Sequence, residues 1–321
     1  MENEETEGFG LIGPNSALDH AIVWTPAIQR LAEAVTNWIR LDSPGGKISG
    51  KPRTGKSAAC IYLKVALQAM IGYPVEVFIW SMPRNGSTRE REYTQERMKQ
   101  CGCSAIMHRD IVVLRNRLYD HVAQMAEIAT ANRVVILIDE AQELATEHYG
   151  YLVHCFNELT RRQLLPFFLL VGQPELESGK YLWDKNEFHQ IAGRFHVHNH
   201  KFRGIMSDEL KGVLAEFDKL IPPAVTGGAA SKFFEKNKLV NLAVPLSEAI
   251  GKLRVHLNLN EEIQLPMQYL KSTILAFIYR ASKMSGDQDF SSVKLMVRCL
   301  TDSGFMRVAS FYVDPDGRIR E

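Results

Sequence analysis

One short segment constrains this chain more than any other, because it fits a phosphate-binding pattern at every fixed position. Residues 50–57 follow the pattern G-x-x-x-x-G-K-[ST] and read, in order, Gly50, Lys51, Pro52, Arg53, Thr54, Gly55, Lys56 and Ser57. In such a loop backbone N–H groups form a nest around a phosphate, the lysine reaches the β- and γ-phosphates, and the hydroxyl ligates Mg²⁺. A helix that starts at Ala58 would point its positive N-terminus at the same phosphates. The pattern predicts a nucleotide site; the alternative is a glycine-rich turn before an amphipathic helix.

A run of apolar residues that ends in two carboxylates supplies the second half of such a site. Residues 134–138 are all Val, Ile or Leu, and Asp139 and Glu140 follow directly. An apolar run without alternation predicts a strand buried on both faces of a parallel sheet, and ligands bind at the carboxyl ends of such strands. Asp139 would hold Mg²⁺ together with Ser57, and Glu140 would polarise the attacking water. The alternative, an acidic N-cap for the next helix, is compatible with these roles.

Length and composition bound the class of protein. A chain of 321 residues with 45% hydrophobic and 23% charged residues predicts one large globular domain or two ordinary ones. No apolar stretch approaches the ~20 residues of a membrane span, and residues 1–7 are acidic without an apolar signal core, so we expect a cytoplasmic protein with no membrane partner. The five cysteines show no disulfide framework, which is typical of a reducing compartment. A net charge of +1 neither requires nor excludes nucleic acid, so any basic footprint must be local.

Two groups of residues have side chains that bind metals elsewhere. Cys101 and Cys103 lie near His108, but a fourth ligand is missing at any standard spacing, so thiols without a metal are favoured. His196, His198 and His200 alternate along an expected strand, which would place all three on one face of the sheet. A polar sheet face is favoured there over a metal site.

Strands and helices alternate over the first two-thirds of the chain. We expect helices at 25–41, after the phosphate loop, from about 91 to 131 and at about 147–163, with strands at 47–49, 75–80, 134–138, 166–171 and 195–200. The first of these strands is weak, because Gly45 and Gly46 flank it. This alternation predicts an α/β fold with a doubly wound, parallel, five-stranded sheet.

After residue 205 the strand pattern fades. Amphipathic helical segments at 207–220, 229–241 and 265–283 predict a small C-terminal helical lid. We therefore expect three parts: a lead segment at 1–24, an α/β nucleotide-binding domain at 25–205, and the helical lid with a C-terminal tail at 206–321.

The order of these features resembles the AAA+ class of P-loop ATPases. An intervening strand separates the phosphate loop from the carboxylate strand, as in P-loop ATPases with an additional strand, and a helical lid points to AAA+. Three segments, DEAQEL at 139–144, VGQPEL at 171–176 and IAGRF at 191–195, together resemble the TnsC/TniB group of transposition regulators. That group is related to the IstB and Cdc6/Orc branches. The resemblance covers residues 20–205 well and the lid poorly, and no clean sensor 2 signature appears there.

The resemblance implies ATP and Mg²⁺ as cofactors, hydrolysis of ATP to ADP and phosphate, and roles for two further residues. Gln173, which ends the fourth strand, resembles the sensor 1 residue that contacts the γ-phosphate or the lytic water; the alternative is an amide that caps a turn. Arg194 occupies the position of the arginine finger, which completes the active site of a neighbouring subunit. The alternative for Arg194 is a surface salt bridge, and Arg161 and Arg162 compete for the finger role.

The segment after the second strand is basic and polar. Arg84, Arg89 and Arg91 lie there among Ser, Thr, Asn and Gly, a composition suited to sequence-independent contacts with DNA phosphates. In the family that it resembles, loops on this part of the sheet line a channel and follow the DNA backbone. The alternative is a solvated loop whose charge Glu90 and Glu92 partly cancel.

The function that the resemblance implies is ATP-dependent regulation of DNA transposition. A homo-oligomer, either a ring or a helical filament, would assemble on double-stranded DNA, recruit and activate a transposase, and work with a target-selection protein. ATP hydrolysis would control target selection. The alternatives are an AAA+ ATPase that acts on protein partners in secretion or signalling, or a helicase loader. A secretion relative would add a membrane span or a peptidoglycan-binding segment, and neither is evident; nor is a nuclease, transposase or helicase signature.

Overall fold

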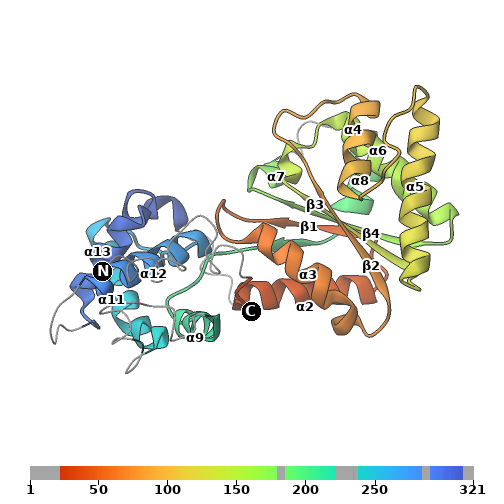
Figure 1. The fold of residues 1–321 in the computed structure, drawn as a ribbon. Helices are drawn as coiled ribbons and strands as arrows, with labels where there is room; N and C mark the ends of the chain where they lie inside the picture. The colour runs from red at the N-terminus through yellow and green to blue at the C-terminus, as the bar shows by residue number, and fades with distance from the viewer. Residues whose placement is uncertain (1–21, 179–184, 221–233, 235–237, 284–289, 314–321) are drawn as a thin grey trace, which may run out of the picture. The chain divides into compact units, whose positions relative to one another are not determined.

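The apolar runs of the sequence form the centre of a parallel sheet. The computed structural model describes residues 22–178, 185–220, 234, 238–283 and 290–313. Five strands form one sheet in the order β2-β3-β4-β1-β5, and every neighbouring pair is parallel (Figure 1). In chain order they are β1 (Gly45–Ser49), β2 (Val75–Ser81), β3 (Arg133–Asp139), β4 (Leu165–Gly172) and β5 (Asn199–Lys201). The predicted doubly wound, five-stranded parallel sheet is therefore confirmed.

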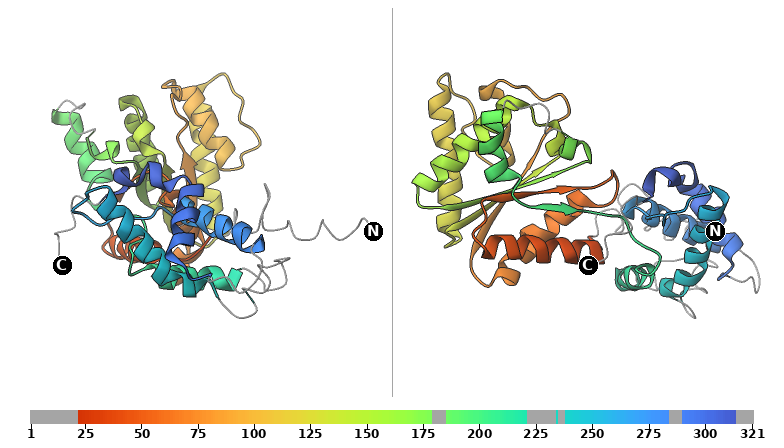
Figure 2. Two further views of the ribbon diagram at one scale, coloured as in Figure 1. Left: turned by 90° about the vertical axis from the view of Figure 1, so that its left-hand side faces the viewer. Right: turned by 180° about the vertical axis from the view of Figure 1, so that it is seen from behind.

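Helices cover both faces of this sheet. On one face lie α2 (Pro26–Arg40) and α3 (Lys56–Ile71); on the other lie α4 (Glu90–Gln100), α5 (Ile111–Ile128), α6 (Thr146–Arg161) and α8 (Lys185–Phe195), as Figures 1 and 2 show. Every residue of β3 is buried, and so is every residue of β4 except Leu165. This explains why both strands read as unbroken apolar runs, because neither face of a doubly covered sheet meets water.

Two short helical segments follow the central strands at the same edge. The 3₁₀ turn η2 (Ala141–Glu143) follows β3, and α7 (Glu175–Ser178) follows β4. The predicted continuous helical stretch between β2 and β3 is two helices, α4 and α5. A non-helical segment at 101–110 separates them, and Asp110 is the N-cap of α5. The Asp110 carboxylate accepts a hydrogen bond from the N–H of Val112 at 2.8 Å, which caps α5.

The predicted strand at 195–200 is wrong in its first half. Phe195 is the last residue of α8 and is fully buried against Phe168, and only Asn199–Lys201 pairs with β1. The predicted common face of the histidines is wrong for the same reason. His196 stacks on Tyr149 of α6, whereas the ring of His198 stacks on Trp38 of α2, which covers the other face. Among the described residues, no group of three or more His, Cys, Asp or Glu side chains is arranged to hold a metal ion.

The chain divides into two compact units. One comprises Arg30–Pro52 and Lys56–Phe202, with the sheet; the other comprises the described residues before Arg30, Arg53–Gly55 and the described residues from Arg203 onward. The second unit is helical, with α9 (Leu210–Leu220), η5 (Leu239–Leu242), α11 (Ala243–His256), α12 (Met267–Ser282), α13 (Val293–Asp302), η6 (Phe305–Arg307) and η7 (Ala309–Tyr312) around its own apolar core. The predicted domain boundaries after residues 24 and 205 stay predictions.

The helical unit differs in part from the expectation. Helices α9 and α12 lie within the predicted segments 207–220 and 265–283, while α11 and α13 were not predicted. Most of the predicted segment 229–241 lies outside the described residues, and its end forms part of the 3₁₀ turn η5.

Candidate nucleotide site

The parallel order of the strands brings the predicted site residues to one edge of the sheet. Strand β4 lies between β1 and β3, so the segments after these three strands meet at their carboxyl ends. The N–H of Gly50, directly after β1, donates to the carbonyl of Gly172 at the end of β4 at 3.2 Å. The phosphate-loop residues before Arg53, the carboxylates after β3 and Gln173 after β4 are thus neighbours within one unit.

Lys56 begins α3 and is almost fully buried. Its side-chain ammonium donates to the carbonyls of Gly50 at 2.7 Å and Lys51 at 2.9 Å. Burial lowers the pKa of Lys56, and the carboxylates of Glu140 and Asp139 act against that shift. A cation in such a place gains most from an anionic ligand, because little water is available to solvate it.

The two predicted magnesium ligands lie in direct contact. The hydroxyl of Ser57 donates to Oδ2 of Asp139 at 2.6 Å, and Asp139 is buried at the end of β3. A hydroxyl and a carboxylate are the hard oxygen donors that Mg²⁺ takes in nucleotide sites. The buried Lys56 and this pair of oxygens therefore fit a Mg²⁺-bound nucleotide, in which the metal would neutralise phosphate charge.

The middle of the phosphate loop has an unusual backbone. Arg53 has φ +63° and Gly55 has φ +109°, the conformations in which a nest exposes successive N–H groups. Residues Arg53–Gly55 belong to the helical unit by their contacts. Within that unit, the guanidinium of Arg53 donates to the hydroxyl of Tyr269 at 2.9 Å. The predicted contacts of residues 50–58 with phosphate, including those of Pro52, Thr54 and Ala58, stay predictions.

Glu140 is presented by a left-handed turn. Its φ of +56° bends the chain after β3, and its N–H donates to Oδ1 of Asp139 at 2.9 Å. Its Oε2 accepts from the side-chain amide of Gln142 at 2.5 Å and from that of Gln173 at 3.5 Å. The segments that follow β2, β3 and β4 line a pocket of about 460 Å³ here, with Met82, Arg84, Glu140, Gln142, Glu143, Gln173 and Glu175. The predicted base and the predicted sensor are brought together, with Gln142 between them.

Arg194, the predicted finger, lies in the last turn of α8. Among the described residues, its guanidinium contacts none of those that line this pocket. Its guanidinium is 3.4 Å from Oδ1 of Asn157 and lies 5.7 Å above the ring centre of Phe156. The two competing arginines are held by ion pairs, Arg161 with Glu158 and Arg162 with Asp120. The role of Arg194 as an arginine finger stays a prediction.

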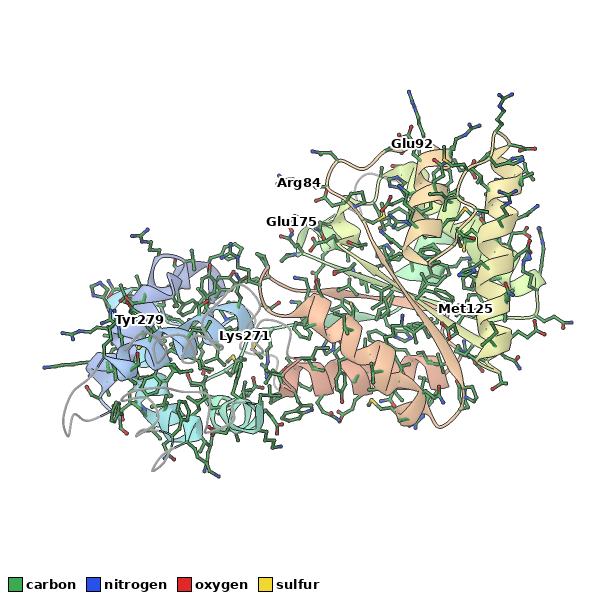
Figure 3. The ribbon with its side chains drawn as sticks, in the orientation of Figure 1. Arg84, Glu92, Met125, Glu175, Lys271 and Tyr279 are labelled. Carbon is green, nitrogen blue, oxygen red and sulfur yellow. The ribbon has the colours of Figure 1, made fainter. Side chains whose placement is uncertain are left out.

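The three arginines after β2 have different surroundings. Arg84 lines the pocket beside Glu140, and Figure 3 shows it on the same side as Glu175. Arg89 pairs with Glu92 at 3.4 Å in solvent, and Arg91 donates to the carbonyl of Arg109. The loop backbone between them is held by Tyr151, whose hydroxyl donates to the carbonyl of Thr88 at 2.9 Å.

Comparisons with known proteins agree with this geometry. Residues 42–178 match a family model described as an AAA domain. The structure is similar to the Aeropyrum pernix ORC2 protein in its ADPNP-ADP complexes, with a TM-score of 0.60, 14% identity, and coverage of 89% of this chain and 71% of that one. It is equally similar to the ADP form of that protein, with a TM-score of 0.59, 14% identity, and coverage of 89% and 72%. No curated protein matches the sequence.

The chain therefore has the AAA+ P-loop NTPase fold and contains an AAA+ ATPase domain. No described helix combines the length and the apolar character that crossing a bilayer requires.

Proposed function

We propose that this protein is an ATP-dependent, DNA-binding regulator of DNA transposition. ATP with Mg²⁺ drives a homo-oligomer onto double-stranded DNA without sequence preference. The assembly recruits and activates a transposase together with a target-selection protein, and ATP hydrolysis controls where the transposase acts. The proposed catalytic group is Glu140 as base, Lys56 and Asp139 with Ser57 at the phosphates and metal, and Gln173 as sensor.

The observation that carries the ATPase part is the meeting of four charged or polar groups at one sheet edge. The ammonium of Lys56 and the hydroxyl of Ser57 come from the start of α3, and the carboxylates of Asp139 and Glu140 come from the end of β3 and the residue after it. Phosphoryl transfer needs charge neutralisation and a positioned water more than covalent help, and these groups supply both.

Support for transposition comes from three segments that together resemble the TnsC/TniB group, and the fold brings these segments to one core. DEAQEL carries Glu140 and Gln142, VGQPEL carries Gln173, and hydrogen bonds from Gln173 to both residues join the two segments. IAGRF forms the end of α8, where Ile191 and Phe195 are buried in the same core. The basic loop with Arg84, Arg89 and Arg91 adds an exposed surface for DNA phosphates.

The test is binding of the full chain to random-sequence duplex DNA across a salt series, with and without a non-hydrolysable ATP analogue. We expect cooperative binding that requires the analogue and weakens steeply with salt. Lys56→Ala should abolish this binding, whereas Lys64→Ala, an exposed lysine on the same helix, should not. Glu140→Gln should keep ATP-bound protein on DNA, because the base is lost while nucleotide binding remains.

Three outcomes would count against the proposal. Unchanged ATP turnover in both Lys56→Ala and Glu140→Gln would refute the site. Absence of DNA binding in every nucleotide state would favour an ATPase that acts on protein partners. Insertion by a cognate transposase that proceeds equally without this protein would refute the regulatory role.

A further inference from the structure

We infer that Gln142 is a positioning residue for hydrolysis, which orients the Glu140 carboxylate by tying one of its oxygens to the end of β4. This inference rests on the proposed ATPase function and adds to it a residue that the phosphate-loop and carboxylate patterns do not include.

The contacts of Gln142 run in both directions. Its Nε2 donates to Oε2 of Glu140 at 2.5 Å, and its Oε1 accepts from the backbone N–H of Gln173 at 3.0 Å. One amide thus links the carboxylate after β3 to the backbone after β4. The side chain of Gln173 is a weaker partner of Glu140, because its Nε2 lies 3.5 Å from the same oxygen.

A general base must point one oxygen at the water it activates, and a carboxylate on a free turn rotates. Both amides converge on Oε2, and Oε1 of Glu140 accepts no hydrogen bond from the described residues. The amide therefore fixes the plane of the carboxylate and leaves Oε1 to face the pocket of about 460 Å³. The left-handed turn at Glu140 makes this possible, since it brings residue 142 back beside residue 140.

The end of β4 is shaped to receive this amide. A Cβ on Gly172 would lie 2.8 Å from Oε1 of Gln142 and 3.2 Å from its backbone nitrogen. Because the nearest atom is the end of a flexible side chain, Gly172→Ala should displace the amide without unfolding the sheet. This substitution therefore disturbs the contact between Gln142 and the backbone of Gln173 without changing Gln142 itself.

Three substitutions separate positioning of Glu140 from simple bracing of β4. Gln142→Met has a similar length and loses both hydrogen bonds, so we expect kcat for ATP to fall by about 10- to 100-fold with nucleotide affinity unchanged. Gln142→Glu keeps an acceptor for the N–H of Gln173 but places a second carboxylate against Glu140. It should be as slow as Gln142→Met at neutral pH, and Gly172→Ala should also lower kcat with little change in melting temperature.

The balance between kcat and nucleotide affinity gives a readout that separates positioning from bracing. Loss of positioning at Glu140 lowers kcat and leaves nucleotide affinity at the wild-type level, because the residues at the phosphates and the metal are unchanged. Loosening of the end of β4 would weaken nucleotide binding together with kcat. Binding of a non-hydrolysable ATP analogue to Gln142→Met, measured beside its kcat, distinguishes the two.

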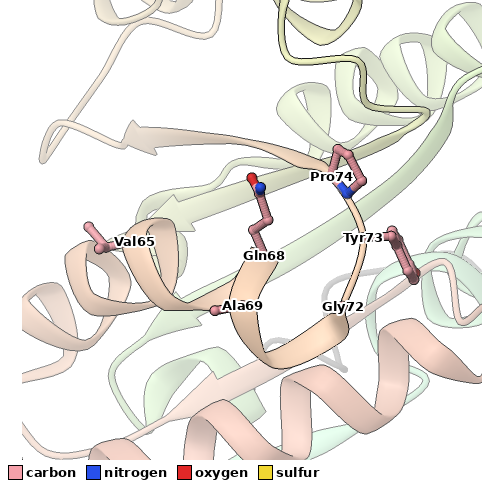
Figure 4. Close-up of a pocket in the computed structure, with 6 residues that line it drawn as sticks. All are labelled: Val65, Gln68, Ala69, Gly72, Tyr73 and Pro74. Atoms are coloured by element: carbon pink, nitrogen blue, oxygen red, sulfur yellow. The ribbon is translucent and has the colours of Figure 1, made fainter.

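A matched control lies at the opposite edge of the sheet. Gln68 lines a second pocket, of about 570 Å³, between the end of α3 and the start of β2 (Figure 4). Its side chain is exposed and makes no hydrogen bond to the described residues. Gln68→Met is the same chemical change without the contact, and it should leave kcat unchanged.

The outcomes distinguish this inference from the function on which it rests. Full activity of Gln142→Met beside an inactive Glu140→Gln would overturn the inference and leave the ATPase site standing. Full activity of Gln142→Glu would overturn it as well, since bracing of β4 would then suffice. Full activity of Glu140→Gln would refute the proposed base itself. Adding Gln142→Met to Glu140→Gln should cause no further loss, because the two act through one group.

Discussion

The arginines after β2 differ in how much of their charge the molecule already uses. Arg84 lies in the pocket with three glutamates, and Arg91 donates to a backbone carbonyl. Arg89 has 83% of its side chain exposed, and its guanidinium forms an i,i+3 ion pair with Glu92. Exposed pairs of this kind contribute little to stability and are easily exchanged. Arg89 is therefore the arginine most available for a DNA phosphate.

Arg89→Ala should weaken nucleotide-dependent DNA binding at low salt and reduce the slope of log K against log[salt] by about one unit. The reason is that one fewer counterion is released when one phosphate contact is lost. Titrations at four or more salt concentrations measure this slope directly. Lys64→Ala removes the same charge from an exposed site on α3 and should leave the slope unchanged; equal slopes for all three proteins would exclude Arg89 from the interface.

For single residues, local sequence patterns predict only part of the candidate nucleotide site. Lys56 and Ser57 follow from a motif, Asp139 and Glu140 from the end of an apolar run, and the structure brings them to one edge of the sheet. Gln142 could not be predicted in the same way. Its contact with Glu140 depends on a left-handed φ at a non-glycine residue and on the neighbouring end of β4, and neither leaves a local pattern.

Among the elements, β1 shows why glycine can belong in a buried strand. The two glycines that make this strand look weak lie inside it, and all five of its residues are buried. A Cβ on Gly45 would lie 2.5 Å from the carbonyl oxygens of both Arg194 and Phe168. The strand lacks a side chain there because the backbones of α8 and β4 approach it closely.

Gly45→Ala should lower the free energy of unfolding by about 1–3 kcal/mol, because two backbone segments must move to admit one methyl group. Gly150→Ala is the matched control: Gly150 lies on the exposed face of α6 with no atom within 4 Å of an added Cβ. Its substitution should stabilise the protein by about 0.5–1 kcal/mol. Denaturant titrations of both variants give the comparison, and two variants of equal stability would contradict this account of β1.

The elements that pattern reading predicts are those with a strong periodic or apolar signal. Strands β2, β3 and β4 and helix α6 lie within one or two residues of their predicted bounds. Helix α11 was missed because Pro245 and Gly251 look like breaks. Pro245 lies in the first turn, where its missing N–H has no intrahelical partner to lose, and Gly251 is exposed. The late start of the fifth strand, at Asn199 rather than at the expected residue 195, is a tertiary effect, since burial of Phe195 keeps that residue helical.

For the whole molecule, the predicted finger requires a second copy of the chain. The charge that an arginine finger neutralises develops on the γ-phosphate. The guanidinium of Arg194 contacts the carbonyl of Gln190 in its own helix and the side chains of Asn157 and Phe156 in α6, and none of these three is a site residue. Arg194 can serve as a finger only in a heterologous, head-to-tail interface, where it faces the site of a neighbour. Such an interface generates either a ring or a filament.

Mixing two inactive variants tests this arrangement. Arg194→Ala should bind nucleotide and lose hydrolysis, since its own site is intact but receives no finger from an identical neighbour. Glu140→Gln provides a finger without a working base. Random assembly at equal amounts should restore about a quarter of the wild-type rate per subunit, because a quarter of the interfaces pair an intact site with an intact finger.

The double variant Glu140→Gln/Arg194→Ala supplies the control for this mixture. Combined with either single variant it creates no complete interface, so turnover should stay at background. Sedimentation of the mixtures establishes that the subunits co-assemble. Co-assembly without recovery would show that Arg194 does not act between subunits. Normal turnover of Arg194→Ala alone would pass the role to Arg161 or Arg162, whose ion pairs would then have to open when subunits meet.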